Sequence, residues 1–87
     1  MIAVRFTPSF VRQIQSLSDE IQEEIFQKVN LFKTQLNHRS LKVHKLKGRL
    51  AGRYSFSVNY HMRIVFEWLG KNEVLFHAIG DHDVYKD

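Results

Sequence analysis

The stretch from Arg53 to Trp68 constrains the fold of this chain most, because apolar and polar side chains alternate along it. Within its two halves the residues at every second position are apolar: Tyr54, Phe56, Val58, Ile64, Phe66 and Trp68. A period of two places such residues on one face of a pleated strand. We therefore predict two antiparallel strands joined by a turn, with an apolar face that other elements must cover. The opposite face begins each half with a cation, Arg53 or Arg63, and could meet an anion.

The first part of the chain is predicted to supply that cover. Residues 2–6 favour a short strand, and Thr7 followed by Pro8 is typical of a helix start. Ser18 is a second candidate N-cap, and the acids that follow it suit the positive end of a helix dipole. Apolar residues recur at steps of three and four along both segments. We expect two antiparallel helices with a tight joint near residues 16–19.

A further strand is predicted at residues 73–79, after a turn at residues 69–72. Strict alternation would separate Val74, Phe76 and Ala78 from Leu75, His77 and Ile79. Both sides are partly apolar, which favours a strand in the interior of the sheet. The basic segment 41–53 contains Gly48 and Gly52, so we expect a loop or an irregular sheet edge there.

The predicted order of elements, β-α-α-β-β-β, defines the fold class. We predict an α+β domain in which a small antiparallel sheet carries the two-helix hairpin on one face. With 87 residues, a single domain spanning residues 1–87 is expected. No apolar run approaches the roughly 20 residues needed to cross a bilayer. Residues 1–6 enter a strand-like pattern rather than a signal peptide, so we expect a cytoplasmic protein.

Charge is unevenly distributed along the sequence. Residues 19–24 contain acids and no base, whereas residues 28–63 contain Lys and Arg but no acid. Within a formal net charge of +4, one sector of the surface is therefore expected to be strongly positive. Such a sector favours a polyanion or an acidic protein as partner. The alternative is a solvated, Lys-rich surface that keeps the protein soluble.

The residue types of this basic sector suit the metal-free cleavage of RNA by its own 2′-hydroxyl. That reaction needs a group that removes the 2′ proton, a cation beside the phosphorane, and an acid for the leaving 5′ oxygen. Arg and Lys suit the second role and His the two proton steps, while an aromatic ring can hold an unstacked base. The candidates are Lys45, Lys47, Arg49, Arg53 and Arg63 as cations, His44 and His82 as proton carriers, and Tyr85 as the stacking ring.

Each candidate also has a plain structural alternative. Arg63 could pair with Glu67 along the same face of its strand, and the loop cations could be ordinary surface charge. His82 could stand idle, and Tyr85 could close an edge of the core. His77 is expected to be half-buried and hydrogen-bonded. The five His residues lack the spacing of a metal site, so neither a metal nor another cofactor is expected.

Four short motifs of the chain resemble those of one known family. They are His44-Lys-Leu-Lys-Gly-Arg, Gly52-Arg-Tyr-Ser-Phe-Ser-Val, Tyr60-His-Met-Arg-Ile-Val-Phe and Ile79-Gly-Asp-His-Asp-Val-Tyr-Lys. Their order and spacing resemble the RelE/ParE superfamily of bacterial type II toxins over essentially the whole chain. The resemblance implies a small toxin that is neutralised by an antitoxin encoded beside it. RelE-like members cleave mRNA in the ribosomal A site without a metal.

The resemblance also implies roles for individual residues. Arg63 matches the strand Arg that contacts the scissile phosphate, and Lys47, with Lys45, matches the basic loop. His82 and Tyr85 match the tail His and aromatic residue of YafQ- and YoeB-like members. The tail is one residue tighter between His82 and Tyr85 than in some relatives.

His44 falls where YafQ-like loops carry a His, so either His44 or His82 could be the base. The second tail Arg of RelE is absent, and the Glu base of YoeB-like members has no obvious counterpart. The catalytic residues that we predict are Arg63, His82, Lys47 and Tyr85, and the RNA-binding residues are His44, Lys45, Arg49 and Arg53.

The predicted function is a metal-independent endoribonuclease, an mRNA interferase that acts on ribosome-bound mRNA and so inhibits translation. The expected partners are a cognate antitoxin with an acidic segment and mRNA on the ribosome. No membrane partner and no small-molecule cofactor is expected. One alternative is a ParE-like toxin that poisons DNA gyrase, although that branch tends to lack the tail His. The other is a non-catalytic RNA- or protein-binding module of the same fold.

Overall fold

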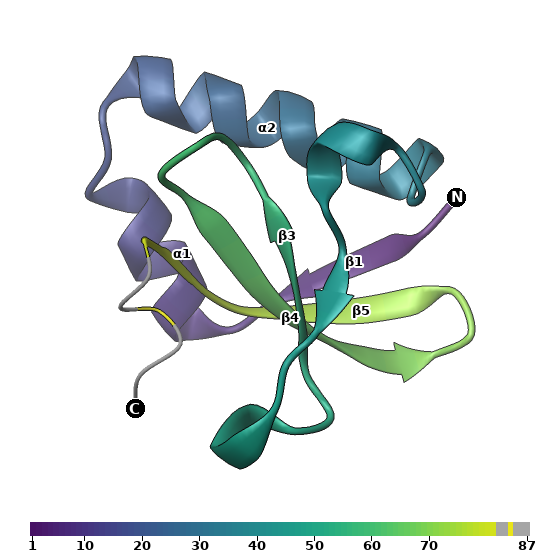
Figure 1. Ribbon diagram of the computed structural model, residues 1–87. Coiled ribbons are helices and arrows are strands. Elements are labelled where there is room, and N and C mark those ends of the chain that lie inside the picture. The colour runs from purple at the N-terminus through teal and green to yellow at the C-terminus, as the bar shows by residue number, and fades with distance from the viewer. Residues whose placement is uncertain (82–83, 85–87) are drawn as a thin grey trace.

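The computed structural model describes residues 1–81 and 84, which form a five-stranded sheet with two α-helices (Figure 1). The strands are β1 (Ala3–Phe6), β2 (His44–Lys45), β3 (Tyr54–Ser57), β4 (Arg63–Gly70) and β5 (Glu73–Gly80). The helices are α1 (Pro8–Gln15) and α2 (Asp19–Thr34), with the short 3₁₀ helices η1 (Arg39–Leu41) and η2 (Gly48–Leu50) on either side of β2. The predicted α+β class, with the helix pair on one face, is confirmed.

The strand order across the sheet is β1-β5-β4-β3-β2. The pairs β2–β3, β3–β4 and β4–β5 are antiparallel, whereas β1 runs parallel to β5. The sheet is therefore mixed rather than wholly antiparallel. The helices carry the chain from β1 at one edge to β2 at the other, so β1 pairs with the last strand instead of a neighbour in sequence (Figure 1).

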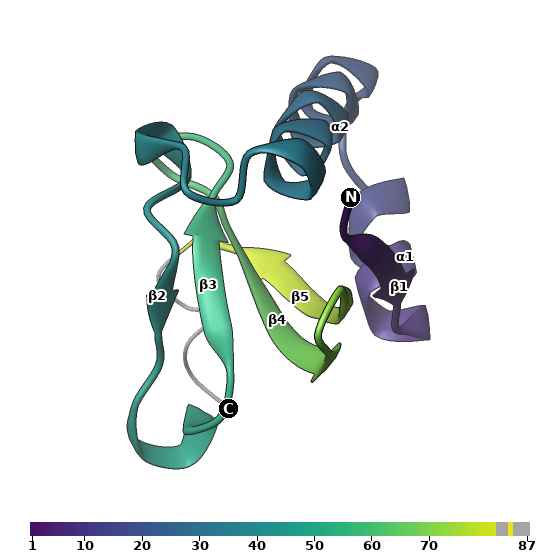
Figure 2. The same cartoon turned by 90° about the vertical axis from the view of Figure 1, so that its right-hand side faces the viewer.

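Both predicted helix starts are confirmed, because each N-cap side chain holds a backbone N–H of the first turn. Thr7 Oγ1 accepts a hydrogen bond from Phe10 N at 3.0 Å, and Ser18 Oγ accepts one from Ile21 N at 3.2 Å. Such caps satisfy donors that lack a partner within the helix. Figures 1 and 2 show α2 lying across α1 rather than antiparallel beside it, so the hairpin is open and α2 reaches over the sheet.

The helix face of the sheet, defined by Phe56, Phe66 and Phe76, forms an aromatic core with the two helices. The Phe32 ring of α2 stacks on Phe56 at a centroid distance of 4.5 Å and meets Phe66 edge-on at 5.0 Å. Phe10 of α1 meets Phe76 edge-on at 5.4 Å. Burial of such a ring stabilises a fold by roughly 1.5–3 kcal/mol. These contacts therefore hold both helices on the sheet.

The alternation predicted for β3 and β4 is confirmed, but in β5 it fails. The residues predicted to face the core, which do so, are Tyr54, Phe56, Val58, Ile64, Phe66 and Trp68. In β5, Phe76 and Ala78 pair with consecutive residues of β4, so His77 between them is the extra residue of a β-bulge. The bulge turns Ile79 into the core, where it is 5% exposed. The predicted faces of Ala78 and Ile79 are therefore wrong, because a bulge shifts the period by one residue.

Two further expectations about the sheet are confirmed. Strand β5 lies between β1 and β4, in the interior of the sheet. The segment expected to be a loop or an irregular edge contains the two-residue edge strand β2. Gly48 and Gly52, with φ of 67° and 91°, lie in the left-handed region that suits Gly and turn the chain from β2 into β3.

Candidate nucleic-acid interface

The second face of the sheet, opposite the helices, carries several of the side chains predicted to act on RNA. One row across it, from β2 to β5, consists of His44, Ser55, Val65 and Ala78. The next row consists of Ser57, Arg63 and Gly80. Residues directly opposite one another in neighbouring strands point to the same face. His44 and Arg63 therefore share the second face, with Cα atoms roughly 12 Å apart by strand spacing and rise.

His44 is held so that one ring nitrogen becomes a proton acceptor on the second face. Its Nδ1 lies 3.0 Å from the Lys42 carbonyl oxygen. A carbonyl can only accept, so Nδ1 carries the proton, and Nε2 is the acceptor in the neutral ring. Ser55 Oγ donates to Nε2 across 3.4 Å, a long contact that a substrate hydroxyl could replace. His44 is exposed as a residue and its partner Ser55 is buried, so Nε2 is a candidate general base at the edge of a part-buried contact.

The backbone at Lys42 explains this orientation of His44. Lys42 follows η1 with φ 50° and ψ 48°, the left-handed region that non-Gly residues adopt at a cost. The turn directs the Lys42 carbonyl at the ring of His44, two residues further on. An unusual backbone that fixes a histidine tautomer fits a site for proton transfer.

Arg63 lines a polar hollow of about 410 Å³ between η1, the end of β3 and the turn that leads into β4. The hollow is lined by Ser40, Lys42, Ser57, Asn59, Tyr60 and Arg63. Arg63 is half-buried, and its Nη1 donates to the Asn59 carbonyl oxygen at 3.4 Å. Among the described residues, the lining contains cations and no acid. The hollow therefore suits a phosphate group, to which a guanidinium offers several donors.

Lys47 is separated from Arg63 along the sheet. Arg63 pairs with Ser57 at one end of β3, whereas Lys47 follows the hydrogen bond from Leu46 N to the Arg53 carbonyl at the other end. At about 3.3 Å per residue, Lys47 is displaced by roughly 17 Å from the Arg63 row. The two cations therefore do not converge on one phosphodiester linkage, and a contact between Lys47 and RNA stays a prediction.

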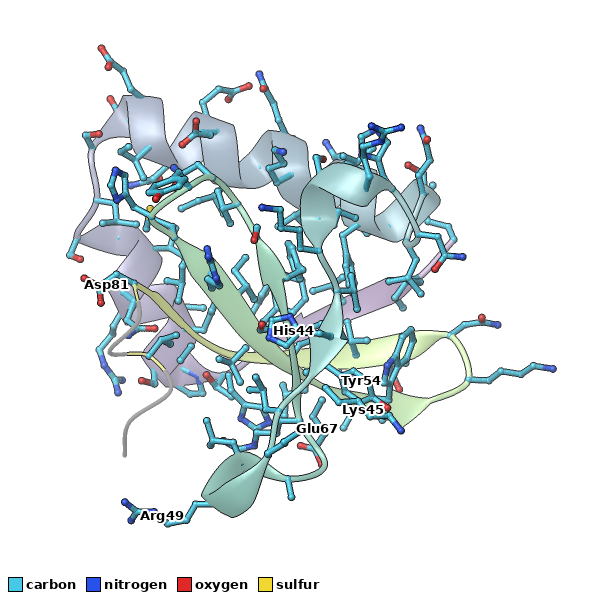
Figure 3. The ribbon with its side chains drawn as sticks, viewed as in Figure 1. His44, Lys45, Arg49, Tyr54, Glu67 and Asp81 are labelled. Atoms are coloured by element: carbon cyan, nitrogen blue, oxygen red, sulfur yellow. The ribbon has the colours of Figure 1, made fainter. Side chains whose placement is uncertain are left out.

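The other predicted RNA-binding cations also lie outside the His44 and Arg63 rows. Lys45 pairs with Tyr54 and so points to the face opposite His44. Figure 3 shows Arg49 projecting from η2, beyond the end of the sheet. Arg53 is half-buried directly before β3. Any contact of these side chains with RNA would involve a different stretch of the strand.

Glu67 and His77 form a pair on the second face, so each of these two side chains has a hydrogen-bond partner. Glu67 Oε1 lies 2.9 Å from His77 Nε2, which joins β4 to β5. The expectation of a half-buried, hydrogen-bonded His77 is confirmed. The alternative pairing of Arg63 with Glu67 is not found among the ion pairs of residues 1–81 and 84, where Arg63 bonds instead to the Asn59 carbonyl.

His82 and Tyr85 lie outside the described residues, so their catalytic roles stay predictions. The tail residue Val84 is described, and it lies beside Gly80. A Cβ added at Gly80 would be 3.4 Å from Val84 Cβ. Because Gly80 pairs with Arg63, the chain at Val84 lies next to the Arg63 row.

Lys42 and Tyr60 belong to the hollow although the sequence did not single them out. Lys42 looked like one more residue of a basic segment, and its backbone conformation leaves no trace in composition. Tyr60 gave a usable signal. It is an aromatic residue between Asn59 and His61, in a turn where the apolar alternation has stopped. An aromatic side chain that no strand face can bury is a candidate for ligand contact.

Neither a metal-binding cluster nor a membrane-spanning helix is found among the described residues. Within residues 1–81 and 84, no group of three His, Asp or Glu side chains could hold a metal ion. In the same part of the chain, no helix is long and apolar enough to span a membrane.

The hydrogen bond to the Glu73 carboxylate raises the pKa of Arg5. That pair joins β1 to β5, at the sheet edge opposite β2.

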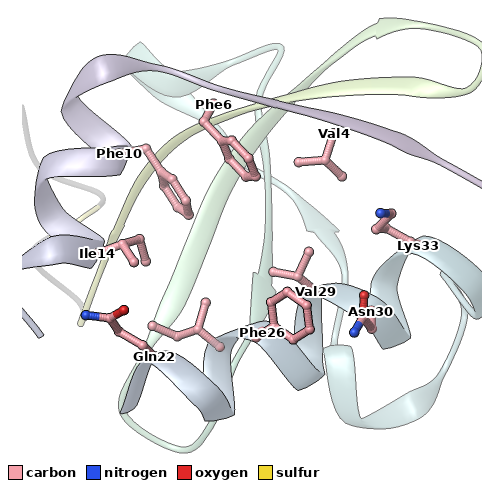
Figure 4. A pocket seen from close by; sticks show the side chains of 10 residues that line it. Val4, Phe6, Phe10, Ile14, Gln22, Phe26, Val29, Asn30 and Lys33 are labelled. Atoms are coloured by element: carbon pink, nitrogen blue, oxygen red, sulfur yellow. The ribbon is translucent and has the colours of Figure 1, made fainter. Parts of the chain in front are cut away.

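An apolar groove of about 390 Å³ lies on the helix side, between β1, α1 and α2 (Figure 4). It is lined by Val4, Phe6, Phe10, Ile14, Gln22, Ile25, Phe26, Val29, Asn30 and Lys33. Phe6 and Phe26 are 52% and 61% exposed. Grouped exposed apolar side chains mark surfaces that bind other molecules. The groove is therefore a candidate protein-binding surface, distinct from the polar hollow.

No protein-family model and no curated protein matches the sequence. Solved structures do match the fold. A YoeB/ParE toxin from Agrobacterium tumefaciens superposes with a TM-score of 0.75 and 20% identity, over 93% of this chain and 99% of that one. YafQ from E. coli superposes with a TM-score of 0.72 and 12% identity over 100% of both chains. In a heterotetrameric YoeB–YefM toxin–antitoxin complex from Staphylococcus aureus, the matching chain gives 0.71 and 20% identity, over 94% of this chain and 98% of that one.

These matches define the class of fold. The chain has the fold of the RelE/ParE toxins, and the resemblance predicted from its motifs is confirmed at that level. YoeB and YafQ toxins are among the proteins of this fold to which the chain is similar along nearly its whole length.

Proposed function

We propose that this chain is the toxin of a type II toxin–antitoxin pair and that it cleaves ribosome-bound mRNA as a metal-independent endoribonuclease. The orientation of His44 carries the proposal, because its Nδ1 is bonded to the Lys42 carbonyl and its Nε2 is left as the acceptor. Arg63 shares the second face with it. A base and a phosphate-binding cation are two of the three groups that the reaction needs.

In this mechanism His44 Nε2 takes the proton of the 2′-hydroxyl, and the 2′ oxygen attacks the phosphorus. Arg63 donates hydrogen bonds to the non-bridging oxygens and balances the charge that grows on them. The bond from phosphorus to the 5′ oxygen breaks as that oxygen receives a proton. The products are a 2′,3′-cyclic phosphate and a 5′-hydroxyl. With His44 as the base, we assign the delivered proton to His82, the other predicted proton carrier, and the holding of a base to Tyr85, the predicted stacking ring.

The loop cations serve a different purpose in the same proposal. Lys47, Arg49 and Arg53 lie at the far end of β3 from Arg63. Cations at that distance bind backbone phosphates further along the strand and add affinity without acting on the reacting linkage. Lys47 is therefore assigned to RNA binding rather than to catalysis.

The antitoxin is proposed to place an apolar segment in the groove between β1, α1 and α2. The solved YoeB–YefM assembly of the same fold is a toxin–antitoxin complex. The groove exposes the rings of Phe6 and Phe26, which a partner would cover. Lys33 in its lining supplies a positive charge for an acidic segment.

Cleavage is tested with ribosomes that carry a defined mRNA. His44→Ala removes the base, and Arg63→Gln removes the phosphate contact. Each should lower the cleavage rate by about 10²- to 10³-fold, the size of effect typical of such groups. Both variants should unfold near the wild-type temperature. Arg12→Gln removes an exposed cation from α1, on the helix side, and serves as the matched control with wild-type cleavage.

Other outcomes would overturn the proposal in distinguishable ways. Full cleavage by both variants would place the chemistry elsewhere. Intact mRNA together with DNA breaks after induction of the wild-type chain would indicate the gyrase-poisoning function. Intact mRNA and intact DNA, with salt-sensitive association with RNA, would indicate the non-catalytic module.

A further inference from the structure

We propose that the hollow beside Arg63 binds the nucleotide next to the cleaved linkage, with its base stacked on Tyr60 and its phosphate beside the Lys42 ammonium. The inference rests on the proposed function, because the ligand is the same single-stranded RNA. Neither side chain transfers a proton in the mechanism above. The hollow is therefore a binding subsite that adds affinity and fixes the register of the strand.

Tyr60 presents an exposed ring, which meets the His61 ring edge-on at a centroid distance of 5.2 Å, on a turn that is firmly held. The residue is 87% exposed. Asn59 Oδ1 accepts hydrogen bonds from the backbone N–H groups of His61 and Met62, each at 2.8 Å. Asn59 Nδ2 also donates to the Glu24 carboxylate, which ties the turn to α2. Because the turn is already ordered, a base that stacks on Tyr60 costs little extra ordering of the protein.

The charge of the hollow favours an anion. The Lys42 and Arg63 side chains line it, and its lining among residues 1–81 and 84 includes no acid. Lys28 Nζ donates to Ser40 Oγ at 3.2 Å, so a third cation lies against a lining residue. The neighbouring carboxylate of Glu24 is bonded to Asn59. A phosphate in the hollow would therefore meet several donors and cations.

The combination of features favours a nucleotide over an acidic peptide. A nucleotide presents a flat π-face and a phosphate a short distance apart, and the hollow presents an exposed ring and cations around a space of about 410 Å³. Single-stranded RNA is bound by this pairing of aromatic rings with a cationic groove. An acidic peptide would use the cations and leave Tyr60 without a function.

The position of the hollow fits the nucleotide beside the reacting one. Ser57 lines the hollow, and Ser55, two residues earlier on the same face, contacts His44 Nε2. Two residues of a strand span roughly 7 Å. A nucleotide in the hollow is therefore close enough to be joined directly to the one whose 2′-hydroxyl meets His44.

The test measures binding without cleavage, using a fluorescent 2′-O-methyl oligoadenylate hexamer that has no nucleophile. A hexamer of the same sugar–phosphate backbone without bases is the matched ligand. Tyr60→Ala should weaken binding of the oligoadenylate by about 5- to 150-fold, the range for one stacked base. It should leave the abasic hexamer unaffected, and Tyr60→Phe, which keeps the ring, should bind both as wild type does.

Lys42→Gly tests the cation separately. Gly adopts a positive φ without strain, so the Lys42 backbone and its carbonyl contact with His44 are kept while the ammonium is removed. Binding of both hexamers should weaken, and the slope of log K against log salt should fall by about one. Thermal unfolding of each variant checks that the fold is unchanged.

Each remaining outcome decides the matter. No measurable binding of either hexamer by the wild-type chain, or equal loss of both hexamers in Tyr60→Ala, would overturn the subsite. Unchanged RNA binding with loss of antitoxin binding would mean that a protein occupies the hollow, and this too would overturn it. Base-dependent binding through Tyr60 in a chain that cleaves no mRNA would keep the subsite and reject the nuclease. Cleavage of mRNA that is independent of Tyr60 would keep the nuclease and reject the subsite.

Discussion

The two faces of the sheet are built from the same strands but are stabilised in different ways. On the helix face, Phe56 of β3 is fully buried against the Phe32 ring of α2. One residue further along the strand, Ser57 faces Arg63 and the polar hollow. The helix face depends on burial of apolar rings, whereas the second face depends on hydrogen bonds that orient individual groups. Stability should therefore be concentrated on one face and recognition of RNA on the other.

The largest expected effect comes from the centre of the helix face. Phe32→Ala should lower the free energy of unfolding by about 3–5 kcal/mol, because it leaves a cavity among buried aromatic rings. In a domain whose total stability is of the order of 5–15 kcal/mol, much of the fold would be lost. Urea denaturation followed by circular dichroism measures this. Phe26→Ala on the same helix removes a largely exposed ring and is the control, with a small effect.

A smaller effect is expected at the outer rim of the helix side, where the ring is exposed. Phe26→Asp should weaken binding of the antitoxin by about 30-fold, the effect of losing one well-packed anchor residue, without unfolding the chain. Titration of the purified antitoxin measures this. Gln27→Asp adds the same charge on the next residue, outside the groove, and should bind almost as wild type does. Equal losses of antitoxin affinity in both variants would show that the added negative charge weakens binding, rather than the loss of a ring from the groove.

The smallest effect is expected at the far end of the second face. Lys47→Gln should weaken RNA binding modestly for every sequence and reduce the salt slope by about one, because it removes one phosphate contact. Its stability should equal that of wild type, since Lys47 is exposed. Binding at several salt concentrations measures the slope. A loss of cleavage rate as large as that of Arg63→Gln would contradict the separation of the two ends of β3.

The fold was largely predictable because its signals are local. Thr7 and Ser18 cap helices through their own side chains, and the alternation in β3 and β4 requires no knowledge of distant residues. The β5 faces were not predictable, because the bulge at His77 arises from pairing with β4. The parallel pairing of β1 with β5 was likewise not predictable, because it depends on the path of the long helical connection that follows β1.

The candidate site was predictable in its residue types but not in its grouping. His44 and Arg63 were both recognised, and both lie on the second face. Lys47 was grouped with Arg63 because both are cations near matching motifs, yet β3 separates them. Tyr60 was overlooked, because a turn aromatic gains meaning only when cations that are distant in sequence lie beside it.

The sequence by itself determined which residues of β3 and β4 face the helices, where the helices begin and which stretch is cationic, since these properties follow from side-chain chemistry and local periodicity. The tertiary structure alone decided the tautomer of His44, the hollow shared by Lys42, Tyr60 and Arg63, and the distance from Arg63 to Lys47. Those features depend on backbone turns and strand register. Register is set by the pairing of segments far apart in the chain, so no local pattern can specify it.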